Sequence, residues 1–176
     1  MLTRRNVVAM VASTALLVRP GPTEAQTLDE LIETGRFEDA VSMVANASPE
    51  EAREAARLIF NAAYRMGHQQ QDYDFAIRGF TAAKRLVDLG EALYEQLSFW
   101  HGFSVYSAAV EAQLPQTIAT AEIALPMFEE ARDLFTSVGT YPSTINVNMA
   151  QLLDATDTYI EIQQTVIRRG RQAGPG

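Results

Sequence analysis

Residues 48–67, with the sequence SPEEAREAARLIFNAAYRMG, carry the strongest helix signal in the chain. Ser48 is a favoured N-cap residue, Pro49 suits the first helical position, and Glu51 occupies the third. Apolar residues then recur every three or four positions, which is the period of a helix with one buried face. We therefore expect an amphipathic helix that follows Ser48 and ends at Gly67.

The same period appears on both sides of this segment, whereas no stretch shows the strict alternation of a half-buried strand. Thr27 and Glu30 have the spacing of a capping box at the start of the first helix. Pro126 lies within an apolar stripe that keeps one phase, which favours a single kinked helix over a break near Ala124. The chain is therefore expected to be all-α. The further expected helices span residues 27–35, 37–47, 72–83, 90–113, 115–139 and 142–169.

The first 25 residues have the three parts of an export signal: a basic start with Arg4 and Arg5, an apolar run over 7–18, and a small-residue end at Ala25. The apolar run has 12 residues, whereas a membrane-spanning helix needs about 20, so we expect cleavage rather than anchoring. The sequence TRRNVV at residues 3–8 resembles the twin-arginine export motif, which usually has Phe-Leu in place of the two valines. An ordinary secretory signal and a retained anchor are the alternatives.

Cleavage after Ala25 would leave a domain over residues 26–169 and a glycine-rich tail, 170–176, that is expected to be disordered. The whole chain has 14 basic and 22 acidic residues, a net charge of −8. Loss of three arginines and one glutamate with the signal would leave 11 and 21, a net charge of −10. This acidity argues against nucleic acid as a partner. We expect a periplasmic or secreted bacterial protein without a membrane anchor after cleavage.

Three segments share one pattern of small and large residues. Residues 35–47 read G-x-F-x-x-A-x-x-x-V-x-x-A, residues 73–83 read Y-x-x-A-x-x-x-F-x-x-A, and residues 124–131 read A-x-x-x-F-x-x-A. This pattern resembles the second half of a tetratricopeptide repeat, over about residues 28–138. The resemblance implies antiparallel helical hairpins stacked as a right-handed array of six or seven helices, with Ala40 and Ala76 at close helix contacts.

This chain departs from the tetratricopeptide family in its spacing. Corresponding alanines are separated by 36 and 48 residues, whereas the family repeats every 34. The family's first-helix signature is poorly kept, since its nearest approach, Trp100, Gly102 and Tyr106, is out of register. A plain helical bundle is the alternative architecture.

The residue types that carry most catalytic chemistry are absent or badly spaced. The chain has no cysteine, no glycine-rich phosphate loop and no Gly-x-Ser-x-Gly elbow. His68 and His101 lack partners at metal-binding spacing. We expect His68 to lie in a solvated turn and His101 at a contact between helices. Catalytic residues, metals and cofactors are therefore not expected.

In a tetratricopeptide array, the first helix of each hairpin lines a concave face that binds peptides or proteins. Here those helices would be residues 50–66, 90–113 and 143–169. On the second of these helices, Phe99, Phe103 and Tyr106 share a stripe distinct from Trp100, which we expect to be structural. The candidate groove residues are Asn61, Tyr64, Arg65, Phe99, Phe103, Tyr106 and Asn146.

These observations favour a non-enzymatic periplasmic interaction module, either an adaptor or an assembly partner that binds a protein or peptide. The alternative is a periplasmic carrier that holds a small ligand in an aromatic-lined groove between helices. An enzyme is less favoured because no catalytic constellation supports it. A homo-oligomer is also compatible with the sequence.

Overall fold

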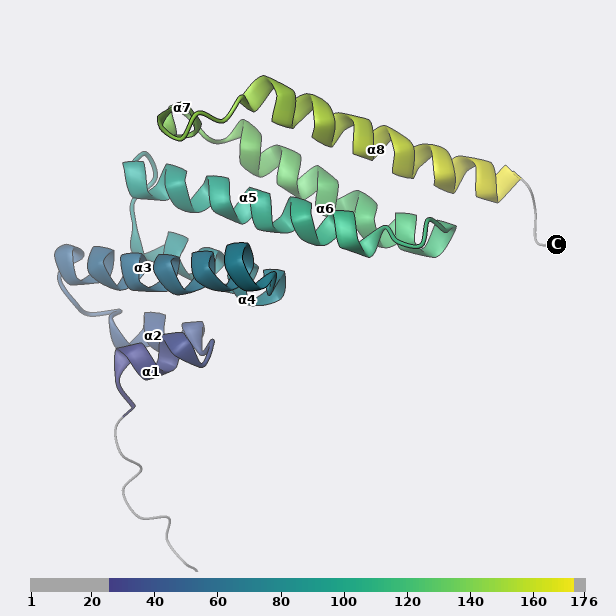
Figure 1. Cartoon of the computed structure of the whole chain (residues 1–176). Helices are drawn as coiled ribbons and strands as arrows, with labels where there is room; N and C mark the ends of the chain where they lie inside the picture. Colours follow the sequence, from purple (N-terminus) through teal and green to yellow (C-terminus); the bar gives the residue numbers. More distant parts are fainter. Residues whose placement is uncertain (1–25, 173–176) are drawn as a thin grey trace, which may run out of the picture.

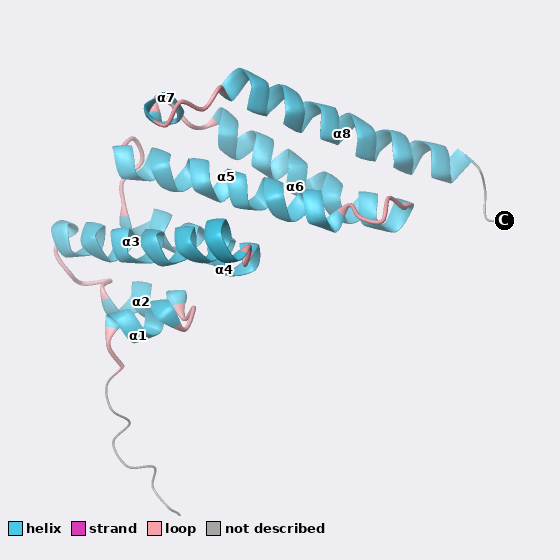
Figure 2. Ribbon diagram, viewed as in Figure 1, coloured by secondary structure: helices cyan, strands magenta, loops and turns pink. Residues whose placement is uncertain are grey.

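The computed structural model describes residues 26–172, and these residues form eight α-helices with no strand among them (Figure 2). Two short segments continue helices: the π-helical turn η1, Arg65–Gln69, follows α3, and the 3₁₀ turn η2, Lys84–Leu86, follows α4. The all-α prediction is confirmed. The helices are α1 Leu28–Glu33, α2 Phe37–Met43, α3 Pro49–Tyr64, α4 Tyr73–Ala83, α5 Ala92–Ala112, α6 Ile118–Thr136, α7 Tyr141–Thr144 and α8 Met149–Gln172.

Successive helices pack as antiparallel pairs that are stacked one on the next (Figure 1). The pairs α1–α2, α3–α4 and α5–α6 follow one another, and α8 packs along α6. The α3–α4 and α5–α6 pairs are joined chiefly by the packing of α4 against α5, whereas α1 and α2 pack on α3 and α4. In this arrangement α3 and α5 belong to consecutive pairs and lie on the same side of the stack, which places their side chains within reach of each other.

The start of α3 agrees with its sequence signals. The Ser48 hydroxyl accepts a hydrogen bond from the Glu51 amide, and the Glu51 carboxylate accepts one from the Ser48 amide, so that two otherwise free donors are satisfied. The end of this helix was predicted wrongly: α3 ends at Tyr64, and the helical path continues through η1, which contains Gly67. Gly67 is buried, and a Cβ at this residue would lie 2.6 Å from the Cβ of Ala76. Its missing side chain therefore serves packing rather than helix termination.

Two other predicted boundaries are also corrected. The helix expected from Pro115 begins at Ile118, because Thr117 provides the N-cap. The helix expected over 142–169 is two helices, α7 and α8, with Asn146 between them at a φ of 56°. Asn148 then caps α8 by accepting a hydrogen bond from the Gln151 amide.

The single helix predicted across Pro126 is confirmed, since α6 continues through this residue. At the other end of the domain, α8 includes residues 170–172, so the expected disordered tail does not begin at Gly170. The predicted signal peptide, 1–25, and residues 173–176 lie outside the described part of the chain. Within that part, no helix is both long enough and apolar enough to cross a membrane.

Small residues control how closely α3 and α4 approach. Gly67 is one such residue, because it lies against Ala76. Gly79 is another, since a Cβ there would lie 2.8 Å from the Cβ of Ala63. Ala76 is fully buried, as is Ala40 of α2, in agreement with the prediction that both alanines lie in packed positions. The close α3–α4 contact fixes the C-terminal end of α3 beside α5, and the candidate site lies there.

Candidate functional site

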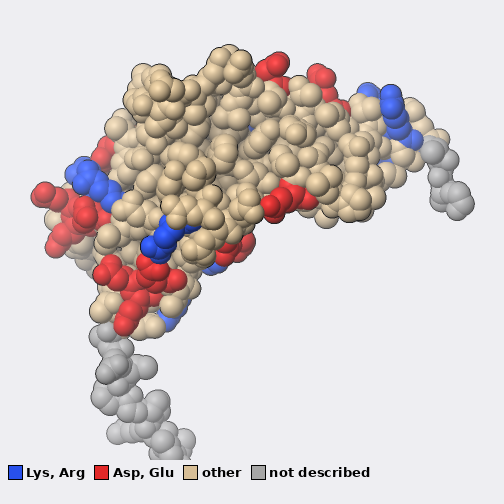
Figure 3. All heavy atoms as spheres, viewed as in Figure 1, with Lys and Arg blue, Asp and Glu red and all other residues tan. Residues whose placement is uncertain are grey.

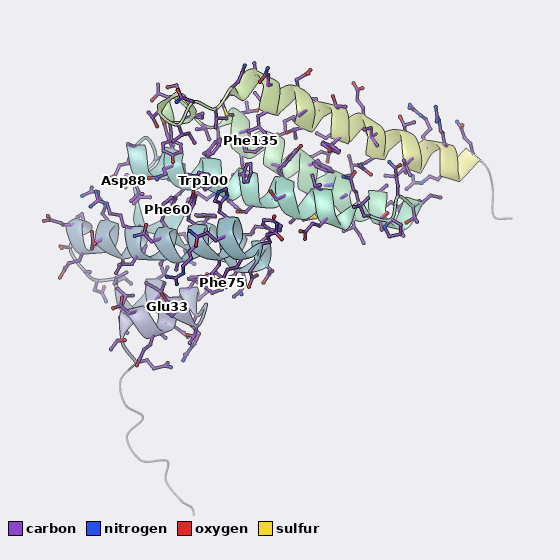
Figure 4. All side chains as sticks on the ribbon, viewed as in Figure 1. Glu33, Phe60, Phe75, Asp88, Trp100 and Phe135 are labelled. Atoms are coloured by element: carbon purple, nitrogen blue, oxygen red, sulfur yellow. The ribbon has the colours of Figure 1, made fainter. Side chains whose placement is uncertain are left out.

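A group of rings from two consecutive helical pairs forms what we call the aromatic surface. It consists of Phe60, Tyr64, His68, Trp100 and Phe103. Figure 4 shows that Phe60 of α3 and Trp100 of α5 lie in the same region, between these two helices. The surface therefore joins α3 and η1 to α5.

Three of these rings form a stacked column along α3 and η1. Tyr64 stacks on Phe60 with ring centroids 5.9 Å apart, and His68 stacks on Tyr64 at 5.1 Å. Residues four apart in an α-helix lie on one face, but each such step drifts around the axis. The wider π-helical turn of η1 reduces this drift and keeps His68 in line with Tyr64. Local backbone geometry thus places the imidazole at the end of the column.

Trp100 connects this column to α5. Its ring meets the rings of Tyr64, His68 and Phe103 at centroid distances of 4.7, 5.5 and 5.7 Å, with interplanar angles of 67–85°. Such edge-to-face contacts add stability beyond the burial of area. The indole Nε1–H donates a hydrogen bond to the Tyr141 hydroxyl at 2.9 Å. Trp100 is therefore held in one orientation while its ring remains partly exposed.

The space beneath these rings is small. A cavity of about 10 Å³ lies between four rings of the aromatic surface and neighbouring side chains of α3, α4, η1 and α5. Its lining residues are Ala63, Tyr64, Gly67, His68, Tyr73, Phe80, Trp100, Phe103 and Ser104. This volume is about that needed by one water molecule. The cavity in this conformation does not accommodate an organic ligand, so the predicted ligand carrier gains no support from it.

Two predicted groove residues, Tyr64 and Phe103, belong to the aromatic surface, and both are partly exposed. Asn61 and Arg65 are exposed residues at the same end of α3 and η1. The Arg65 guanidinium lies 2.8 Å from the Glu33 carboxylate of α1, so its charge is compensated.

The remaining predicted residues lie elsewhere. Phe99 is only 1% exposed and packs in the core against Phe135, which corrects its expected place in a groove. Tyr106 contacts Phe128 of α6 and Tyr159 of α8, and burial and its contact with Tyr159 raise its pKa. Asn146 is exposed in the turn between α7 and α8.

Sequence reasoning missed Phe60, His68 and Trp100 as parts of this surface. The spacing F-x-x-x-Y-x-x-x-H over residues 60–68 could have indicated the column, because it repeats one helical face. The predicted stop at Gly67 hid this signal. His68 is exposed, as expected, but it belongs to a helical turn and stacks on rings rather than lying free in a loop.

The buried His101 has polar neighbours from α4, η2 and α6. The Lys84 ammonium lies 2.9 Å from His101 Nδ1, while Thr81 Oγ1 and Glu130 Oε1 lie 3.4 and 4.0 Å from Nε2. Because an ammonium only donates, Nδ1 accepts and Nε2 carries the proton of the neutral ring. Burial, reinforced by the charge of Lys84, lowers the pKa of His101 to about 3. The predicted position of His101 at a helix contact is confirmed.

The charges are unevenly distributed over the molecule. In Figure 3, charged side chains gather at the α1–α3 end and at the C-terminal end of α8, and the face between these ends is mostly uncharged apart from a few acidic groups. Among residues 26–172, no group of three or more potential ligands is placed to hold a metal ion.

Comparisons with protein-family models, curated proteins and solved structures give no match to this chain.

Proposed function

We propose that this protein is an interaction module of the periplasm that binds a protein or peptide partner through its aromatic surface. The observation that carries the proposal is the contact between Tyr64 and His68 on one helical pair and Trp100 and Phe103 on the next. Aromatic side chains that are partly exposed and rigidly held are typical of binding surfaces, because they bury large area at little entropic cost.

The proposed architecture is a tetratricopeptide-like array. Antiparallel pairs that follow one another and cross at small residues support this proposal. In such an array the first helices of successive pairs share one face. Tyr64 and Trp100 lie on two such helices, so a partner on this face would contact consecutive pairs together.

The test is affinity capture from periplasmic extract with the mature protein and with its Phe103→Ala variant. Phe103 is partly exposed, so the variant should fold while losing part of the binding surface. We expect mass spectrometry to identify a protein that the wild type captures and the variant does not. Binding should then be measured with that protein after purification.

A matched control is Ile123→Ala, which removes an exposed apolar side chain from α6, away from the aromatic surface. This variant should capture the same partner as the wild type. Equal capture by Phe103→Ala and by the wild type would contradict the proposed site, provided that both proteins have cooperative thermal melts.

A further inference from the structure

The aromatic surface already holds a planar nitrogen-containing group from its own chain. The His68 imidazole stacks on Tyr64 at an interplanar angle of 25°, and it meets Trp100 and Phe103 at centroid distances of 5.5 and 6.4 Å. Phe60 stacks on the same tyrosine at 21°. In this column, displacement of His68 would expose one face of the Tyr64 ring.

Such a face has a defined chemical preference. Aromatic faces carry partial negative charge and attract cations within about 6 Å of the ring centre. The arginine guanidinium is flat and weakly hydrated, so it stacks on rings more readily than a lysine ammonium does. A guanidinium on Tyr64 would meet the same three rings that His68 now contacts.

The overall charge favours the same class of partner. The chain has a net charge of −8, which attracts a basic segment over a distance of about a Debye length. Arg65, the neighbour of Tyr64 in sequence, is paired with Glu33. Its compensated charge reduces the repulsion that an incoming cation would meet at this end of α3.

We propose that the partner presents a basic segment and that one of its arginine side chains replaces His68 on the Tyr64 ring. This inference rests on the proposed function and names the partner's chemistry. His68 is exposed, so its side chain can turn away into solvent. Trp100 stays in place because its Nε1–H is bonded to Tyr141, and the binding surface therefore remains assembled after the exchange.

Trp100 is the single tryptophan of the chain, so its fluorescence reports on this site. The experiment titrates the mature protein with a nonapeptide of arginine in 150 mM salt. The comparison peptides are a nonapeptide of citrulline, which is the uncharged analogue of arginine, and a nonapeptide of proline. We expect the arginine peptide to change the emission in a saturable way and the other two to have little effect.

Three variants separate stacking from general attraction between opposite charges. Tyr64→Leu keeps the net charge and should weaken binding of the arginine peptide at least fivefold. His68→Ala removes the competing ring and should strengthen binding about threefold. Tyr159→Leu makes the same chemical change as Tyr64→Leu at a ring of α8 outside the surface, and it should bind like the wild type.

Equal binding by Tyr64→Leu and the wild type would overturn the proposal, as would equal binding of the citrulline peptide. Saturable binding of the proline peptide alone would also overturn it and indicate an extended apolar partner. If affinity capture depends on Phe103 but the arginine peptide does not bind, the interaction function stands and only the basic partner is rejected. Thermal melts of each variant confirm that the comparison concerns folded proteins.

Discussion

The indole Nε1–H of Trp100 donates a hydrogen bond to the Tyr141 hydroxyl, and this contact links α5 to α7 across 41 residues of sequence. Both groups are partly buried, so loss of one partner leaves the other without its bond. Tyr141→Phe should lower the free energy of unfolding by about 1 kcal/mol, the usual net value of such a bond. Urea denaturation measures this change, and Tyr94→Phe is the control. An unchanged midpoint for Tyr141→Phe would contradict a stabilising role.

Ala76 has no room for a larger side chain, because it lies against Gly67 where α4 meets η1. Ala76→Leu should therefore reduce stability by about 1–3 kcal/mol through overpacking. Ala119→Leu provides the control, since Ala119 is exposed on α6. Thermal melts of the two variants should differ clearly. Similar melting temperatures would show that the contact between α4 and η1 tolerates a larger side chain at residue 76.

Phe99 and Phe103 are four residues apart on α5 but should respond differently to truncation. Phe99→Ala removes a side chain that is 1% exposed, and it should cost about 3–5 kcal/mol because a cavity remains. Phe103→Ala removes a partly exposed ring and should cost about 1–2 kcal/mol, in proportion to the smaller apolar area that is lost. Chemical denaturation measures both values. Equal losses would place Phe103 in the core and weaken the proposed binding site.

The buried His101 should make the protein sensitive to acid. Its pKa is about 3 in the folded protein, whereas an unfolded histidine has a value near 6.5. Between these values the unfolded state binds the additional proton, so stability falls as pH is lowered from about 6.5 toward 3. The loss should be on the order of a few kcal/mol over this range.

The measurement is a series of urea denaturation curves between pH 7 and pH 4. His101→Gln should flatten the decline, because glutamine does not titrate and can still accept a hydrogen bond from Lys84. His68→Gln removes the other histidine of the chain and controls for loss of a histidine. A decline that is as steep in His101→Gln as in the wild type would assign the acid sensitivity to other groups.

Export should depend on the arginine pair at the start of the chain. Replacing Arg4 and Arg5 together by lysine keeps the charge but removes the pair that the twin-arginine route recognises. The precursor of this variant should accumulate in the cytoplasm, as shown by cell fractionation and immunoblotting. Normal export of the double variant would instead favour the general secretory route.

The helices were predictable because their signals are local. Ser48 with Glu51, and the recurrence of small apolar residues along α3 and α4, depend on neighbours within one or two turns. The division of the last segment into α7 and α8 was missed, since Asn146 adopts a positive φ that no strong turn motif announces.

The candidate site was predicted only in part because α5 is apolar on several sides. It packs against α4 and α6 and also contacts α3 and α7, so periodicity alone does not identify one buried face. Phe99 was therefore assigned to a groove although it lies in the core, and Trp100 was assigned to a separate structural face although it contacts Phe103. The contact of Trp100 with Tyr64 depends on how two helical pairs stack, and this relationship is not encoded in either helix alone.

The π-helical turn η1 holds one residue more than the α-helical turn that it replaces, so it is equivalent to a single-residue insertion in a longer helix. The turn begins after Tyr64, so it leaves the packed register of α3 unchanged while it redirects His68. The stacking of His68 on Tyr64 therefore depends on the number of residues between them as well as on the identity of the two rings. Deletion of one residue between Tyr64 and His68 would reduce their spacing from four to three and turn the imidazole away from the column.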